Sequence, residues 1–168
     1  MKKQPNPWEL GATLYMPATR KDIAEVVLEG KIPGLRSLVV CLEDAVSEHD
    51  IPLAIQNLSL FLKQLRHARA VNDDEKYPLV FIRPRHTDMG GWLTTNLALS
   101  AVDGFVLPKF TLSTLPVWWD IMAGTSLMMM PTLETEEVYD VIKMQALANE
   151  LSSHDCRDRI IALRIGGN

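Results

Sequence analysis

The sequence has few cysteines, no long apolar run and no excess of positive charge. Cys41 and Cys156 are the only cysteines. They have no metal-like pairing, so the chain suits a reducing compartment, and we expect it to be cytoplasmic. Lys2 and Lys3 precede prolines rather than an apolar run, which gives no signal peptide. No segment approaches the roughly 20 apolar residues that cross a bilayer. The net charge of −4 favours neither nucleic acid nor an anionic membrane.

The sequence also lacks the glycine fingerprint of a dinucleotide site. Such a fingerprint would follow the first strand of an α/β sheet, but residues 16–20 contain no glycine. With 168 residues, 47% of them apolar and 23% charged, the chain is ordinary for one globular domain with a sizeable core.

Apolar segments with strand character alternate with segments of helical period. The strands are expected at residues 12–16, 37–42, 79–82, 104–107, 127–130 and 160–165. Five helices are expected at 19–29, from Pro52 onward, around 92–99 after a break at Gly90-Gly91, near 114–122, and at 136–151. Such alternation predicts a parallel α/β sheet, either open and doubly wound or part of an eight-stranded barrel. Residues 1–11 are expected to form a flexible leader and residues 12–168 the domain.

Charged residues follow several of the predicted strands directly. Glu43 and Asp44 follow the second strand, Arg83 the third, Lys109 the fourth and Glu134 the fifth. A polar loop explains any one of these residues. Their recurrence favours a mixed acidic and basic pocket, because parallel strands bring their carboxyl ends to one edge, where α/β enzymes bind ligands.

Glu134 is the natural ligand for a divalent cation in this arrangement. Carboxylates on adjacent strands, about 4.8 Å apart, can share one ion, and Mg²⁺ prefers oxygen ligands at about 2.1 Å. The partner carboxylate is expected just after Gly166-Gly167-Asn168. We therefore expect Glu134 to lie beside the Gly166-Gly167 bend, the two marking half of a cation site.

Six short motifs occur in an order that resembles the citrate lyase beta-subunit family. This family includes the malyl-CoA lyases and belongs to the HpcH/HpaI aldolase superfamily. Two departures are Cys41, where an aspartate is usual, and Pro84-Arg85, where a small polar residue is expected after Arg83. The motifs are Leu14-Tyr15-Met16-Pro17-Ala18-Thr19-Arg20, Leu42-Glu43-Asp44-Ala45-Val46, Arg83, Gly104-Phe105-Val106-Leu107-Pro108-Lys109, Leu133-Glu134-Thr135 and Leu163-Arg164-Ile165-Gly166-Gly167-Asn168.

The resemblance implies a TIM barrel, a fold of about 250 residues, of which residues 12–168 would supply strands one to six. It implies a magnesium-dependent carbon–carbon lyase or aldolase that cleaves a 3-hydroxy-acyl or 2-keto acid substrate, with CoA as a candidate part of the substrate. Glu134 would bind Mg²⁺, and the catalytic residues would be Arg83, Glu43 and Asp44. The small anionic substrate would contact Arg20, Arg83, Lys109, Gly166 and Gly167.

Two other functions remain open. The departures at Cys41 and Pro84 favour a catalytically silent binding or assembly subunit on the same scaffold. A third interpretation is an aldolase that acts on a 2-keto acid without CoA. A barrel without strands seven and eight has two unpaired edges. We therefore expect a fragment of a longer product, a homo-oligomer in which another copy fills the gap, or a protein of impaired function. With one metal carboxylate absent, the 168-residue chain alone is expected to have weak or no lyase activity.

Overall fold

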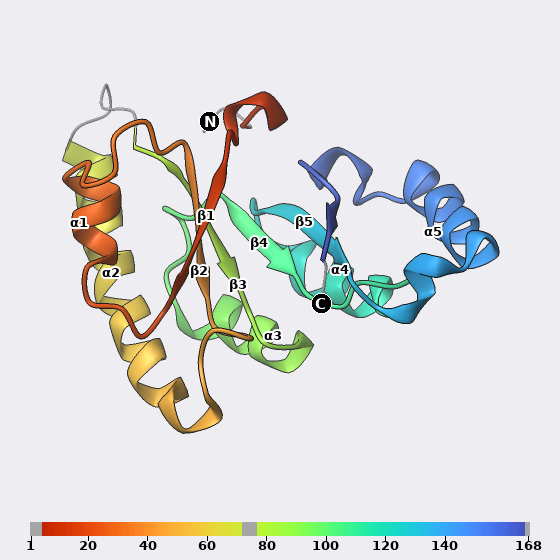
Figure 1. Cartoon of the computed structure of the whole chain (residues 1–168), viewed down its shortest axis with the longest axis horizontal. Helices are drawn as coiled ribbons and strands as arrows, with labels where there is room; N and C mark the ends of the chain where they lie inside the picture. Colours follow the sequence, from red (N-terminus) through yellow and green to blue (C-terminus); the bar gives the residue numbers. More distant parts are fainter. Residues whose placement is uncertain (1–4, 72–76, 167–168) are drawn as a thin grey trace.

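Six parallel strands, paired in their chain order, form the frame of the structure. The computed structural model describes residues 5–71 and 77–166. Figure 1 shows the strands in a single curved array. The strands are β1 (Thr13–Pro17), β2 (Ser37–Cys41), β3 (Leu79–Arg83), β4 (Gly104–Leu107), β5 (Met128–Leu133) and β6 (Arg164–Ile165).

Helices connect successive strands, as parallel pairing requires. Figure 1 shows α1 and α2 at one end of the strand array and α5 at the other. In the described part of the chain the α-helices are α1 (Ile23–Leu28), α2 (Ile51–Val71), α3 (Thr87–Asn96), α4 (Leu115–Met122) and α5 (Val141–Ser153). Short 3₁₀ helices occur at η1 (Pro7–Glu9), η2 (Glu48–Asp50), η3 (Glu136–Tyr139) and η4 (Arg157–Arg159).

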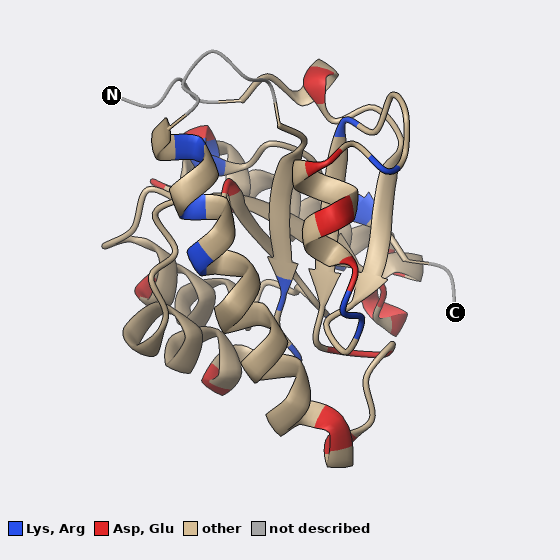
Figure 2. Cartoon of the chain, turned by 90° about the vertical axis from the view of Figure 1, so that its left-hand side faces the viewer, with Lys and Arg blue, Asp and Glu red and all other residues tan. Residues whose placement is uncertain are grey.

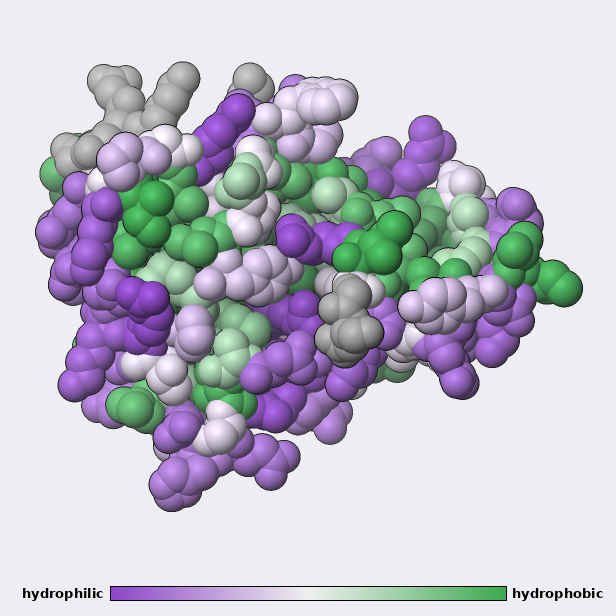
Figure 3. Space-filling model, viewed as in Figure 1, coloured by the Kyte–Doolittle hydropathy of each residue, from purple (hydrophilic) through white to green (hydrophobic). Residues whose placement is uncertain are grey.

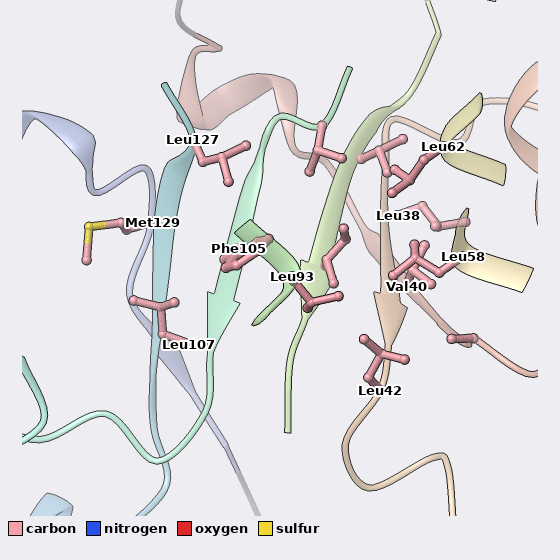
Figure 4. Packing of buried hydrophobic residues seen from close by; sticks show 14 of the residues in the cluster. Leu38, Val40, Leu42, Leu58, Leu62, Leu93, Phe105, Leu107, Leu127 and Met129 are labelled. Carbon is pink, nitrogen blue, oxygen red and sulfur yellow. The ribbon is translucent and has the colours of Figure 1, made fainter. Parts of the chain in front are cut away.

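The larger hydrophobic core lies between the outer face of the sheet and the helices. Successive residues of a strand face opposite sides of a sheet, so Leu38 and Val40 of β2 share the face that packs against α2. Figure 4 shows these two side chains near Leu58 and Leu62 of α2. The continuous apolar strands predicted from the sequence are therefore explained by burial on both faces.

A second, smaller cluster covers the inner face of the curved sheet. Its buried members are Leu10, Val39, Phe81, Val106, Met128, Met130 and Ile161. Residues filling the inner face and helices covering the outer face are the arrangement of a (β/α)₈ barrel. The predicted fold class, an incomplete TIM barrel with six parallel strands and five α-helices, is confirmed for the described residues.

The predicted break at Gly90-Gly91 is wrong. Both glycines lie inside α3, which begins at Thr87 after His86, whose side chain accepts a hydrogen bond from the Met89 backbone N–H. Gly90 is needed for close packing, because a Cβ there would lie 2.6 Å from Cζ3 of the buried Trp118 on α4. A glycine pair that looks like a loop in sequence is here a contact between two helices.

The end of the described chain also differs from the prediction. The expected helix at 136–151 divides into η3 and α5, with Asp140 capping α5 through its side chain. Val141 and Ile142 fit the apolar spacing of this helix but are each 81% exposed, and Leu147 and Leu151 provide its buried contacts. The sixth strand is reduced to Arg164–Ile165, preceded by a single bridge between Met129 and Ile160.

The described start of the chain has more structure than a flexible leader. Asn6 and Glu9 form a capping box around η1, and Leu10 is buried at the inner face of the sheet.

Exposed apolar residues near the described end of the chain include Tyr139, Leu163 and Ile165, besides Val141 and Ile142. Figure 3 shows apolar surface around the end of the molecule that carries α5. Within the described residues, no helix is both long and apolar enough to span a bilayer.

Candidate active site

The charged residues predicted from the strand ends come together at one edge of the sheet. Figure 2 shows acidic and basic segments close to the arrowheads of the strands. Glu43 and Asp44 follow β2, Arg83 ends β3, Lys109 follows β4 and Glu134 follows β5. Because all strands run parallel, their carboxyl ends meet here, and the predicted mixed pocket gathers around Arg83.

Arg83 is the centre of this charged cluster. Its buried guanidinium pairs with three carboxylates: Glu43 through Nε and Nη2, Asp44 at 3.3 Å, and both oxygens of Glu134 at 3.0 and 3.1 Å. The Glu43 and Glu134 side chains are even more buried than that of Arg83, whereas the Asp44 side chain is 67% exposed. Two buried pairs therefore position the guanidinium, and the exposed Asp44 pair adds little.

Burial and ion pairing shift the pKa values of this cluster in opposite directions. Burial disfavours the charged form of Arg83, but the charges of Glu43 and Glu134 outweigh it and raise the arginine pKa. Burial also raises the pKa of Glu43, and the Asp44 and Glu134 carboxylates add to the rise, while Arg83 opposes it. Arg83 thus stays cationic, and burial inclines Glu43 toward its protonated form.

Lys109 contributes its backbone as well as its charge. Its φ of 48° lies in the left-handed region, which is uncommon for a residue other than glycine. In this conformation its backbone N–H donates to Glu134 Oε1 at 2.9 Å. Its exposed ammonium lies 3.5 Å from Glu43 Oε1. A strained backbone position at the strand end thus serves to orient Glu134.

Glu134 lies directly beside the Gly166 bend, as predicted. The Gly166 N–H donates to the Leu133 carbonyl at 3.1 Å, which continues the pairing of β5 with β6. A Cβ on Gly166 would lie 2.6 Å from Glu134 Cβ and 2.7 Å from Glu134 Oε2. Only glycine fits against this carboxylate without a shift. Gly167, the other glycine of the predicted substrate site, and Asn168 lie outside the described residues.

Arg20 does not join the cluster. Its guanidinium forms two hydrogen bonds with Asp22, at 2.8 and 2.6 Å, on the exposed surface between β1 and α1. These bonds lower the pKa of Asp22 and raise that of Arg20. The pair also engages Lys31. Within the described part of the chain, Arg20 has a local structural partner rather than a contact with Arg83 or Glu134.

Arg85 was set aside in the sequence as a departure from the expected motif, but it supports the site. Its guanidinium donates to the backbone carbonyl of Val46. The Val46 N–H in turn donates to the Glu43 carbonyl at 3.0 Å. Arg85 therefore holds the loop that carries Glu43 and Asp44, which no sequence spacing indicated.

Tyr15 and Arg164 are the other residues that sequence reasoning missed. Burial raises the pKa of Tyr15, and the charge of Arg164, then the charge of Arg83 and its hydrogen bond with the hydroxyl, partly offset the rise. The Arg164 guanidinium carbon lies 5.0 Å from the centre of the Tyr15 ring. The sequence could have indicated Arg164 as a site residue, because it precedes Gly166 by two positions and alternation along an extended chain places both on the same face. Its contact with the first strand depends on the curvature of the whole sheet.

The donor set fits Mg²⁺ at one carboxylate. Magnesium is commonly held by one or two carboxylates together with water and substrate oxygens. Glu134 Oε2 faces the space left by Gly166, and the buried Glu43 Oε1 accepts no hydrogen bond from the described residues, although the Lys109 ammonium pairs with it at 3.5 Å. Both features suit an added cation, although Arg83 already donates to Glu134. The described residues contain no group of three or more His, Cys, Asp or Glu side chains arranged for a metal.

An α/β barrel scaffold with a charged cluster at the carboxyl ends of its strands is the layout of a TIM-barrel enzyme. Residues 4–168 match the model of one family, described as C–C bond lyase of the TIM-barrel fold. The match spans nearly the whole chain, and the protein belongs to this family. The search of curated proteins found no match.

Proposed function

We propose that this C–C bond lyase is magnesium-dependent and cleaves a 3-hydroxy-acyl or 2-keto acid substrate, in the manner of the citrate lyase beta-subunit family. The observation that carries the proposal is the position of Glu134. It lies against the Gly166 bend and is held by Arg83 and the Lys109 backbone. This is where a cation ligand is expected in a site whose chemistry takes place at the ends of the strands.

Glu134 would hold the cation with its oxygen beside Gly166. A bound Mg²⁺ would supply positive charge at the carbonyl oxygen of the substrate. The described residues supply one carboxylate to this bend, so we expect weak metal binding by this chain.

Arg83 is suited to stabilise the negative charge that develops beside the breaking carbon–carbon bond. Its hydrogen bonds to the three carboxylates come from Nε and Nη2, so none of these acids engages Nη1. Glu43 and Glu134 fix the guanidinium plane, so little reorganisation is needed as charge develops. Lys109, exposed beside Glu43, is placed to attract an anionic substrate.

The experiment is a cleavage assay on a panel of 3-hydroxy-acyl-CoA thioesters and 2-keto acids, with products followed by mass spectrometry. We expect slow turnover that requires added Mg²⁺, stops with a chelator and is lost in Glu134→Gln. The matched control is Glu136→Gln, an exposed glutamate two residues away, which should retain wild-type turnover. Turnover that survives Glu134→Gln, or that ignores the chelator, would contradict the proposal. Activity on 2-keto acids but no CoA thioester would select the CoA-independent aldolase.

A binding or assembly subunit without catalysis is the second candidate. The observation in its favour is that both Glu134 oxygens already accept hydrogen bonds from Arg83, which competes with a cation for them. This function predicts no turnover of any panel member, with or without Mg²⁺.

A further inference from the structure

Arg164 differs from Arg83, on the same inner face of the sheet, in having no carboxylate partner among the described residues. It is half-buried on β6, and its Nη1 donates to the sulfur of Met130 at 3.4 Å. Its other contact is the face of the Tyr15 ring, 5.0 Å from the guanidinium carbon. No acidic side chain of the described residues forms an ion pair with it, whereas Arg83 on the same face has three.

These contacts leave most of the hydrogen-bonding capacity of Arg164 unused. A guanidinium carries five N–H donors in a planar fork that matches a carboxylate, and a thioether is a weak acceptor. An aromatic face stabilises the cation through its π system without accepting the in-plane hydrogen bonds. Tyr15 therefore fixes the side chain while the donor edges remain available to a ligand.

Tyr15 also links Arg164 to the proposed reaction centre. Its ring contacts Arg164 and its hydroxyl lies against Arg83. Arg164 stands two residues before Gly166, which abuts Glu134. The guanidinium thus lies on the same inner face of the sheet as Arg83, and among the described residues no carboxylate of the Arg83 cluster forms an ion pair with it.

We propose that Arg164 binds a carboxylate group of the substrate and that Tyr15 is a positioning residue for Arg164. The substrate role depends on the proposed lyase function, whereas carboxylate binding does not. Arg83, surrounded by acidic groups, acts at the carbonyl oxygen, and Arg164 recognises the anionic end of the molecule. The division follows from the different partners of the two arginines.

The test is calorimetric titration of malonate, a small dicarboxylate, into protein freed of metal on a chelating resin. Arg164→Gln should weaken binding by roughly 10- to 150-fold, the usual effect of losing a charge-assisted contact. Arg164→Lys should restore part of it, since lysine keeps the charge but not the fork. Tyr15→Leu should bind more weakly than wild type, because the aromatic face that holds the guanidinium is lost. Arg157→Gln is the control, a loss of an exposed arginine on η4.

Circular dichroism checks that each variant is folded. The proposal is overturned if wild-type protein does not bind malonate, if Arg164→Gln binds within twofold of wild type, or if the uncharged dimethyl ester binds equally well. Equal loss in Arg157→Gln would also overturn it. If the lyase function alone is wrong, the results differ: wild-type protein binds malonate and Arg164→Gln does not, but wild-type protein cleaves no member of the substrate panel. Cleavage by wild type with an unchanged KM in Arg164→Gln would refute the role of Arg164 alone.

Discussion

Replacement of Gly166 by alanine tests the geometry on which the proposed metal site depends. The added Cβ would lie 2.6 Å from Glu134 Cβ, whereas an ordinary contact begins at 3.4 Å. Either Glu134 or the bend must therefore move by about 0.8 Å, beyond the roughly 0.5 Å within which a functional group must be held. The Glu134 hydrogen bonds from Arg83 and the Lys109 backbone, now 2.9–3.1 Å, would be disturbed together.

We expect Gly166→Ala to lower Mg²⁺ affinity by about 10- to 100-fold and turnover by about 100-fold. The cost in unfolding free energy should be about 1–3 kcal/mol, the usual effect of one overpacked methyl group. Metal affinity is measured by calorimetric titration with Mg²⁺, and stability by urea denaturation.

Gly124→Ala is the matched control, because nothing lies within 4 Å of a Cβ at that position. It should leave both metal affinity and turnover unchanged. Wild-type Mg²⁺ affinity and turnover in Gly166→Ala would refute the argument that Gly166 and Glu134 form one half of a cation site. An equal loss in Gly124→Ala would also refute it.

Two further predictions concern the buried carboxyl group and the helix contact. The pKa of Glu43 is higher in the folded protein than in the unfolded chain, so the folded state binds the Glu43 proton more strongly. The stability that this proton contributes is therefore full below the pKa of the unfolded chain and is lost as the pH rises through the pKa of the folded protein. The unfolding free energy of wild type relative to Glu43→Gln should therefore increase as the pH falls from 7 to 4. Unfolding free energies are measured by urea denaturation, with Glu48→Gln, which replaces an exposed glutamate, as the control. A difference between wild type and Glu43→Gln that stays constant, or that shrinks as the pH falls, would refute the raised pKa of Glu43. Gly90→Ala should destabilise the fold by about 1–3 kcal/mol through its clash with Trp118, whereas Gly91→Ala, whose nearest contact is 3.9 Å, should stabilise it by up to about 1 kcal/mol. Similar thermal midpoints for these two variants would contradict the packing argument.

Local patterns were enough to predict the strands and the strand-end cluster. The run Leu38-Val39-Val40 is apolar throughout because one face packs on helices and the other lines the inner core. The gathering of Glu43, Arg83 and Glu134 followed from parallel topology alone. Neither inference needed a distance between strands that are remote in sequence.

The missed features depend on geometry that no local pattern carries. Gly90 reads as a break until Trp118 is placed against it, and the apolar spacing of α5 does not reveal that Val141 and Ile142 are exposed. The contact between Tyr15 and Arg164 joins the first strand to the last, so it follows from the curvature of all six strands. Tertiary context overrides local preference at such positions.

The balance of charge offers a physical reason for two separate arginine environments. Around Arg83, three carboxylates face two cations, Arg83 and Lys109, which leaves the cluster with excess negative charge. Such a cluster favours a divalent cation and repels the carboxylate of a substrate. A substrate with both a carbonyl and an anionic group would need a second, unneutralised cation on the same face. Arg164 meets this requirement because Tyr15, rather than an acid, holds it in place.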